Sequence, residues 1–377
     1  MAARVWRCGP RDGLGASHRS RIFAAPGAVR QCPRIARSVL CIMAVLCGAA
    51  APGRAEEPGA AALAAAATAT GTPRALITST FFLTSDGVRL HVLEGGPAGA
   101  AAGAESPTSA GTAVAAAHAA PVIAFVPGWS MPARIWQAQL GALATRYRVA
   151  ALDPRGQGES ERPAQGYTIE RRAEDVGEFV ARYPRVALVA WSLGALEALR
   201  FISRSASVRA TRIAALVIVD SSVGEGHAQA APPPGTGFLD ELKRDRSATV
   251  ESFVRAIFRR PQAEAELLAL RDGALRMPLE ASLSLFPSAV PRSFWRRAVH
   301  GFHRPLLYVV TPQFVAQAAA LGRSRPGTRT ELFREAGHAL FVDEPERFNA
   351  LLLRFLHDNG MGVDGTAPEA ERRRRGR

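Results

Sequence analysis

The chain has 377 residues, of which 47% are hydrophobic, so it can bury a sizeable core in one large domain or two average ones. Its formal charge of +14 is concentrated near the two ends. Residues 1–54 hold nine arginines and one acid, and residues 361–377 hold five arginines and three acids, which leaves about +4 for the rest. This distribution gives no case for a nucleic-acid partner. All four cysteines precede residue 48, which excludes a disulfide, a thiol nucleophile and a cysteine metal site from the body of the chain.

Residues 1–55 are predicted to be a leader that contains a secretory signal peptide. A basic stretch at 34–37 precedes an apolar run at 39–51 and then small residues at 52–55, which is the layout of an export signal. The apolar run is shorter than a transmembrane helix requires, so no stable membrane span is expected in the mature chain. We therefore expect an exported protein, periplasmic or secreted. A basic leader on a cytoplasmic protein is the alternative.

Two low-complexity stretches flank a predicted hairpin. Residues 56–75 are rich in alanine, glycine and threonine and are expected to form a flexible linker. The runs 76–83 and 88–93 alternate apolar and polar positions around a Ser-Asp-Gly turn signal, which predicts two antiparallel strands. Residues 95–120 are predicted to be a long surface insertion. The main domain is expected to span 76–360, with 361–377 as a basic disordered tail.

From residue 121 onward, short apolar runs alternate with helical patterns. Buried strands are predicted at 121–126, 148–152, 186–189, 213–219, 304–310 and 328–333, and helices at 133–145, 168–182, 344–357 and from residue 195. This alternation predicts an α/β fold with a mostly parallel central sheet flanked by helices. Residues 225–303 interrupt it with a proline-rich start and amphipathic helical segments. They are predicted to form a helical cap inserted after the strand that ends at Asp220.

One serine stands at the turn between a predicted strand and a predicted helix. The strand at 186–189 runs into the sequence AWSLG, centred on Ser192, and helical periodicity follows. A strand, a tight turn of small residues and a helix form the nucleophile-elbow pattern. That pattern presents the hydroxyl above the sheet and aims the next backbone N–H, that of Leu193, at a developing oxyanion. Ala190 occupies the first glycine position of the usual G-x-S-x-G pattern, and an ordinary turn serine is the alternative.

Five features, in order, resemble the α/β-hydrolase superfamily over residues 77–357. They are Pro-Gly-Trp at 127–129, DPRGQGES at 153–160, AWSLG at 190–194, the helical cap, and GHALFVDEPERF at 337–348. The resemblance implies the α/β-hydrolase fold, with the site at the carboxyl ends of the strands. It also implies that Ser192 is the nucleophile and His338 the general base, and that the backbone N–H groups of Trp129 and Leu193 form the oxyanion hole. Pro127 stands where the family usually has histidine.

The carboxylate of the expected triad is missing from its usual position. In most relatives it follows the strand that here ends at Val310, but residues 311–314 read TPQF and no acid occurs between Glu280 and Glu331. We predict Asp220 as the replacement, because some members of the superfamily carry their acid at that strand end and the chain order Ser192, Asp220, His338 is kept. A non-catalytic aspartate bonded to loop amides is the alternative.

Three further residues receive roles outside the triad. Asp153 is interpreted as a structural loop carboxylate. Asp343 is expected to cap the helix that begins at Glu344. Trp191 is predicted, together with Trp129, to form an aromatic wall of the substrate pocket, with ordinary packing under the cap as the alternative.

The predicted function is a serine hydrolase that cleaves a small or medium apolar ester, lactone or related acyl bond through an acyl-enzyme. Its partner is a small-molecule substrate, and no metal or organic cofactor is indicated. A cofactor-free haloperoxidase or perhydrolase is the enzymatic alternative, because the Pro-Gly-Trp loop resembles that branch of the superfamily. A catalytically inactive hydrolase fold used as a binding module is the alternative outside the enzymes, and the empty acid position motivates it.

Overall fold

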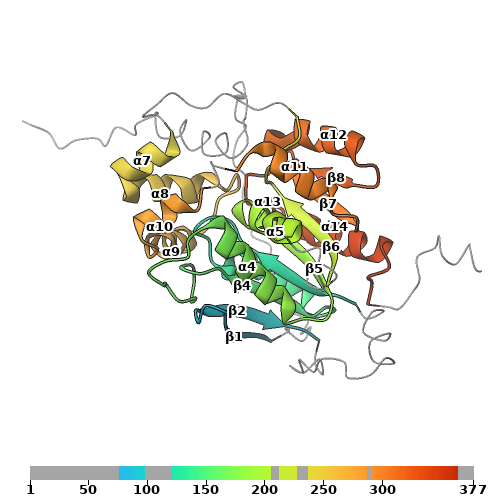
Figure 1. Cartoon of the computed structure of the whole chain (residues 1–377), viewed down its shortest axis with the longest axis horizontal. Coiled ribbons are helices and arrows are strands. Elements are labelled where there is room, and N and C mark those ends of the chain that lie inside the picture. The colour runs from blue at the N-terminus through green and yellow to red at the C-terminus, as the bar shows by residue number, and fades with distance from the viewer. Residues whose placement is uncertain (1–75, 98–119, 205–211, 227–236, 287–289, 364–377) are drawn as a thin grey trace, which may run out of the picture. The chain divides into compact units, whose positions relative to one another are not determined.

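Eight strands form one sheet in the computed structural model, which describes residues 76–97, 120–204, 212–226, 237–286 and 290–363 (Figure 1). The predicted leader, the linker, nearly all of the insertion and the basic tail lie outside these residues. The strands are β1 (Ile77–Leu83), β2 (Arg89–Gly95), β3 (Val122–Val126), β4 (Val149–Asp153), β5 (Val186–Trp191), β6 (Ile213–Val219), β7 (Leu306–Val310) and β8 (Arg329–Leu332). Their order in the sheet is β1-β2-β4-β3-β5-β6-β7-β8.

The sheet is parallel except at one end. β1 pairs antiparallel with β2, and β2 pairs antiparallel with β4, whereas all pairs from β4 to β8 are parallel. β3, β5, β6 and β7 are buried along their whole length, as expected for strands covered on both faces. The predicted α/β fold with a mostly parallel sheet is confirmed, and the carboxyl ends of β3, β5, β6 and β7 meet at one edge.

Helices cover both faces of this sheet. α4 (Ile169–Ala181) and α5 (Leu193–Arg204) pack together on one face, in front of the strands in Figure 1, while α3 (Gln137–Leu143) contacts α14 (Pro345–Asp358). Thr168 caps the N-terminus of α4, because its hydroxyl accepts a hydrogen bond from the Arg171 N–H at 3.2 Å. The single helix predicted at 133–145 is two elements, the 3₁₀ turn η1 (Ala133–Trp136) followed by α3.

The segment after β6 supplies the predicted helical cap. Its helices are α7 (Phe238–Arg244), α8 (Arg246–Ala256), α9 (Glu264–Leu275) and α10 (Leu279–Ser284), which form one group beside α4 in Figure 1. The last helix of the predicted cap segment, α11 (Arg292–His300), instead packs against α5 of the main domain. After β7 the chain adds η2 (Pro312–Phe314) and α12 (Val315–Ser324), and α13 (Leu340–Asp343) precedes α14.

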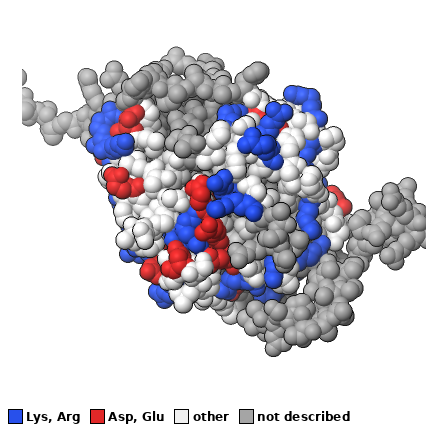
Figure 2. Space-filling view, viewed as in Figure 1, with Lys and Arg blue, Asp and Glu red and all other residues white. Residues whose placement is uncertain are grey.

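The surface seen over α4 and α5 carries charges of both signs. Figure 2 shows acidic and basic side chains interleaved there, and the contacts include Arg171–Glu178 at 2.6 Å and Arg200–Glu170 at 2.9 Å. No helix within the described ranges is long and apolar enough to cross a membrane.

A buried arginine joins the hairpin to the main domain. Arg155, whose side chain is fully buried, donates to both carboxylate oxygens of Asp175 on α4, at 2.6 and 2.7 Å. It also donates to Asp86 in the hairpin turn, at 3.0 and 3.1 Å. These hydrogen bonds hold the pKa of the Asp86 carboxyl at about 2, well below its usual 3.8. The turn between β1 and β2 is therefore fixed to α4 by one guanidinium group.

We expect Asp175→Asn to destabilise the protein strongly. The substitution leaves the buried Arg155 charge without its main partner, and breaking a buried ion pair in this way costs roughly 3–5 kcal/mol. The free energy of unfolding from urea titration measures the change. As a matched control, Glu264→Gln breaks an exposed pair with Arg255 and should cost far less than Asp175→Asn, because solvent screens this pair. Equal losses for the two variants would contradict the role given to Arg155.

Candidate active site

Three non-glycine residues in the described ranges have positive φ angles, and all three lie at the carboxyl edge of the sheet. Ser192 (φ 54°) follows β5, Asp220 (φ 41°) follows β6, and Ser130 (φ 58°) lies in the loop after β3. An L-residue adopts this conformation at a cost, and such strain clusters at functional sites. The backbone alone therefore points to the place where β3, β5 and β6 end.

The turn around Ser192 is held by backbone contacts on both sides. The Ser192 N–H donates to the Val219 carbonyl at 3.0 Å, and the Ser221 hydroxyl donates to the Ser192 carbonyl at 2.8 Å. A side chain at Gly194 would place its Cβ 2.4 Å from the Pro127 carbonyl oxygen, so only glycine fits the second small position of AWSLG. Helix α5 begins immediately after the serine, as the elbow pattern predicts.

Asp220 and His338 form a buried hydrogen-bonded pair. Asp220 Oδ2 lies 2.8 Å from His338 Nδ1, and the aspartate side chain is fully buried. Its other oxygen, Oδ1, accepts a hydrogen bond from the Thr311 N–H at 2.6 Å. Thr311 directly follows β7, where relatives usually carry the acid. The structure therefore brings the carboxylate that we predicted from chain order to the histidine that we predicted from its motif.

His338 lies next to the elbow, although its ring does not bond the serine. The Trp191 indole N–H donates to the His338 carbonyl at 3.0 Å, and the two rings are 5.0 Å apart. Among the described residues there is no hydrogen bond between the Ser192 hydroxyl and the His338 ring; in unliganded sites such bonds are often long. Trp191 is 1% exposed and also packs on Phe341. It packs against the His338 loop. Its assignment as a wall of the substrate pocket stays a prediction.

The loop after β3 lies against the serine. A Cβ on Gly128 would be 3.0 Å from the Ser192 Cβ, so the backbone that leads to Trp129 passes directly beside the elbow. Among hydrogen bonds between described residues, none has the backbone N–H of Trp129 or of Leu193 as its donor. Within the part of the chain that the structure describes, neither predicted oxyanion-hole donor is therefore used in a hydrogen bond.

A buried polar network holds this loop. Gln157, from the loop after β4, donates its side-chain amide to the Gly128 and Met131 carbonyls at 3.2 and 2.7 Å. Arg172 of α4 donates to the Gln157 side-chain oxygen at 3.0 Å and lies 3.0 Å from the Glu197 carboxylate on α5. The network links the elbow helix to the Trp129 loop through side chains that are almost completely buried.

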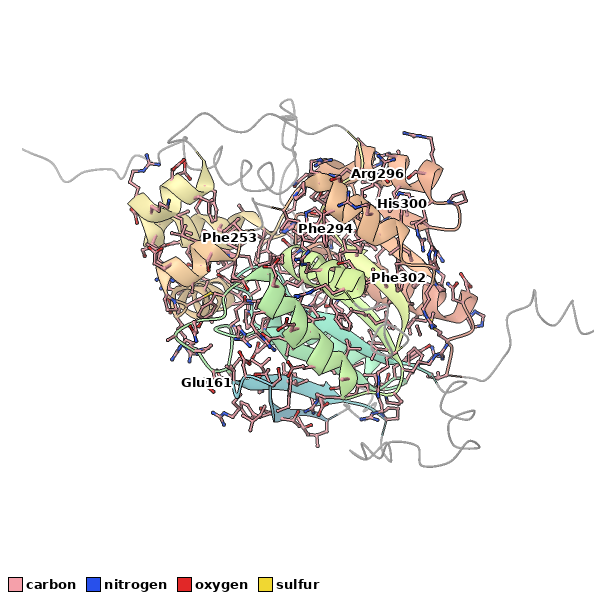
Figure 3. All side chains as sticks on the ribbon, viewed as in Figure 1. Glu161, Phe253, Phe294, Arg296, His300 and Phe302 are labelled. Atoms are coloured by element: carbon pink, nitrogen blue, oxygen red, sulfur yellow. The ribbon has the colours of Figure 1, made fainter. Side chains whose placement is uncertain are left out.

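The cap contacts the same loop through Trp129. Its indole N–H donates to the Ser282 carbonyl at 2.9 Å, and its ring contacts Phe238, Phe253 and Phe286 at centroid distances of 5.2–5.5 Å. Figure 3 labels Phe253 within the cap helices. Trp129 therefore packs into an aromatic cluster of the cap, while its backbone stays next to Ser192.

The prediction that Asp343 caps the following helix is wrong. Its carboxylate accepts hydrogen bonds from the Gly337 N–H at 2.7 Å and from the Arg259 and Arg260 N–H groups at 2.8 and 3.1 Å. The N-cap position of α14 is Glu344, without a side-chain capping bond. Asp343 is buried and joins the cap loop after α8 to the residue before His338, because two unpaired backbone segments meet there.

Sequence reasoning missed four residues that support the site. Gln157 was seen only as part of DPRGQGES, and the capping pattern concealed the role of Asp343. Arg172 and Glu197 lie within two helices, where charged residues are usually solvent-exposed, so nothing in the sequence marked them as buried.

No group of three or more potential metal ligands occurs among the residues that the structure describes.

Comparisons with known proteins agree with this architecture. The family model described as "Alpha/beta hydrolase family" matches residues 123–351. A curated relative, the pimeloyl-[acyl-carrier protein] methyl ester esterase of Aeromonas hydrophila, is 28% identical over 260 residues, which are 63% of this chain and 95% of that protein.

Two solved structures share the fold. A bromoperoxidase from Bacillus anthracis superposes with a TM-score of 0.60 at 20% identity, covering 74% of this chain and 100% of that one. An esterase from Exiguobacterium antarcticum gives a TM-score of 0.59 at 19% identity, with coverage of 74% and 99%.

We expect the stability of the wild-type protein to fall as pH rises through 7, and Glu197→Gln to remove that fall. Burial raises the pKa of the Glu197 carboxyl from 4.5 to about 7, against the opposing effect of Arg172. Between these pH values the folded state holds a proton that the unfolded state releases, so this contribution is complete below pH 4.5 and lost above pH 7. Its size is at most roughly 3 kcal/mol.

Urea titrations at pH 5, 6, 7 and 8 measure this effect. The difference in unfolding free energy between wild type and Glu197→Gln should change from pH 5 to pH 7 and level off by pH 8. Glu264→Gln, at an exposed position, is the control and should give a constant difference. A constant difference for Glu197→Gln as well would contradict the assigned pKa.

Proposed function

Because the chain belongs to the alpha/beta hydrolase family and is a carboxylic ester hydrolase-like enzyme, we propose that it acts as a serine esterase with Ser192, His338 and Asp220 as its triad. The observation that carries the proposal is the 2.8 Å contact between Asp220 and His338 beside the strained Ser192 turn. A carboxylate only accepts hydrogen bonds, so Nδ1 of the neutral ring carries the proton and Nε2 is left as a base.

The reaction follows from these positions. Ser192 Oγ attacks the ester carbonyl carbon while His338 Nε2 takes its proton, and Asp220 stabilises the imidazolium that forms. The oxygen charge that develops is bound by the Trp129 and Leu193 N–H groups. His338 then protonates the leaving alcohol, and a water molecule, activated by the same ring, hydrolyses the acyl-Ser192 intermediate.

The proposed substrate is an ester with a small or medium apolar acyl group. Ser192 and His338 are only 8% and 7% exposed, so the substrate must enter beneath the cap. The cap surface nearest the Trp129 loop is aromatic, and an apolar group fits it better than a charged one. The name of the curated relatives, methyl ester esterases, supports an ester with a small alcohol group.

Neither alternative from the sequence has a specific observation in its favour. Likeness to the bromoperoxidase, at 20% identity, concerns the fold alone. The inactive binding module was considered because no carboxylate follows β7. The Asp220–His338 contact supplies a carboxylate from the neighbouring strand, so this reason no longer favours an inactive protein. Export, in contrast, remains our proposal on the leader sequence alone.

Ser192→Ala and Asp220→Asn should each abolish most of the hydrolysis of p-nitrophenyl butyrate. Loss of the nucleophile or of the carboxylate lowers kcat by roughly 10⁴-fold in triad enzymes. Initial rates, together with mass spectrometry of the protein after treatment with a fluorophosphonate, measure both effects. The wild-type adduct should lie on Ser192.

Ser203→Ala is the matched control, since this serine on α5 is exposed and its hydroxyl donates to the Arg200 carbonyl of its own helix. It should keep full activity and the Ser192 adduct. A Ser192→Ala variant that hydrolyses short-chain esters at the wild-type rate would overturn the proposal. If Asp220→Asn alone stayed active, the serine would be retained and Asp220 would lose its assigned role.

Expression of the full chain in a Gram-negative host tests export. We expect the protein in the periplasmic or culture fraction, with its N-terminus beginning near residue 55. An unprocessed chain confined to the cytoplasm would favour a basic leader instead.

A further inference from the structure

A Ser–His–Asp chain of hydrogen bonds lies at the antiparallel end of the sheet. Ser79 Oγ on β1 is 2.5 Å from His91 Nε2 on β2, and His91 Nδ1 is 2.7 Å from Asp153 Oδ2 at the end of β4. None of these residues belongs to the site around Ser192. From this geometry we propose that Ser79 is a second activated serine, a modification site for electrophilic acyl and phosphonyl donors.

The direction of each hydrogen bond follows from the environment of Asp153. Its Oδ2 accepts the Glu159 N–H at 2.9 Å, and its Oδ1 accepts the Ala133 N–H, so the carboxylate is held in its acceptor form. Nδ1 of His91 must then donate to it. In the neutral ring this leaves Nε2 as an acceptor, and the Ser79 hydroxyl donates to it. His91 is therefore oriented as a general base for Ser79, by the same logic as in a catalytic triad.

In this chain of hydrogen bonds the histidine and the aspartate are buried, and the serine is accessible to solvent. His91 and Asp153 are 4% and 3% exposed, whereas Ser79 is exposed. Glu161, labelled in Figure 3 beside β2, accepts the Arg89 N–H at 3.0 Å and fixes β2 to the loop after Asp153. A reagent can thus reach Ser79 while its base stays fixed.

A cavity lies beside Leu93, the residue that is paired with Ser79. Its volume is about 400 Å³, and it is lined by residues of β1, β2, η1 and α3, namely Leu76, Ile77, Leu93, Arg134, Gln137, Leu140 and Gly141. Ser79 is paired directly with Leu93, and residues opposite each other on paired strands share a face about 5 Å apart. The mostly apolar lining would accept the alkyl arm of a donor whose reactive centre lies at Ser79.

The modification step balances without any further reactant. With an alkyl fluorophosphonate, Ser79 Oγ forms a bond to phosphorus, fluoride leaves with the bonding electron pair, and the hydroxyl proton passes to His91 Nε2. With an activated ester, the Oγ–carbonyl bond forms and a phenolate leaves. Asp153 keeps its charge throughout and stabilises the imidazolium.

The test uses the full chain with Ser192→Ala, so that its outcome does not depend on the proposed esterase. The protein is treated with a biotin-tagged alkyl fluorophosphonate, and adducts on individual serines are quantified over time by mass spectrometry. Ser85 is the internal control: it lies in the turn of the same hairpin, but its hydroxyl donates to the Glu178 carboxylate at 2.8 Å rather than to a histidine. Ser79 should react on the order of 10²-fold faster than Ser85, the size of a general-base effect.

Adding His91→Gln to Ser192→Ala should bring the Ser79 rate down to that of Ser85, with folding checked by circular dichroism. Equal rates for Ser79 and Ser85 in Ser192→Ala itself would overturn the proposal whether or not the His91 variant folds. Fast Ser79 labelling that survives the loss of His91 in folded protein would also overturn it, since exposure alone would then explain the reaction.

Discussion

The placement of one carboxylate determines how the site around Ser192 is built. Asp220 stands at the end of β6 with a positive φ angle and a fully buried side chain. A buried carboxylate needs hydrogen-bond donors, and here it has two: the Thr311 N–H from the end of β7 and the His338 ring. The backbone at the usual acid position thus supplies a donor to the acid of the neighbouring strand. Relocating the carboxylate by one strand keeps the histidine in place because β6 and β7 are paired in parallel register.

Two contacts tie the cap to this arrangement from opposite sides. Asp343 binds the cap loop at Arg259 and the backbone next to His338, while Trp129 inserts its indole into the aromatic cluster of the cap. A displacement of the cap would therefore move the segments that carry the proposed general base and one proposed oxyanion-hole donor. The cap is therefore attached to both segments that carry the proposed catalytic groups.

The sequence was sufficient for the fold, because the fold follows from local patterns, while the triad of Ser192, Asp220 and His338 stays a prediction. Buried parallel strands are short apolar runs with sharp ends, and Ser192 and His338 stand in recognisable turns. Asp343 shows where local reasoning fails. An aspartate before a helix has the pattern of a cap, but three unpaired backbone N–H groups from two distant loops meet at its carboxylate. Only the tertiary structure brings those donors together, so no pattern within one segment could predict the contact.

Ser79, His91 and Asp153 are a second example of residues that only the tertiary structure brings together. Asp153 was correctly interpreted as a loop carboxylate that binds backbone amides, yet that very role fixes its orientation toward His91. The histidine lies on β2, and the antiparallel pairing of β2 with both β1 and β4 brings it next to Ser79, 12 positions earlier, and Asp153, 62 positions later in the sequence. Among the described residues, the chain of hydrogen bonds from serine to histidine to aspartate is therefore complete at Ser79, whereas at Ser192 only the bond between histidine and aspartate is formed. The two sites differ in their surroundings: Ser192 stands in a strained turn at a helix N-terminus, beside the loop that carries Trp129, whereas Ser79 stands in a regular edge strand. We therefore assign turnover to the first and only stoichiometric modification to the second.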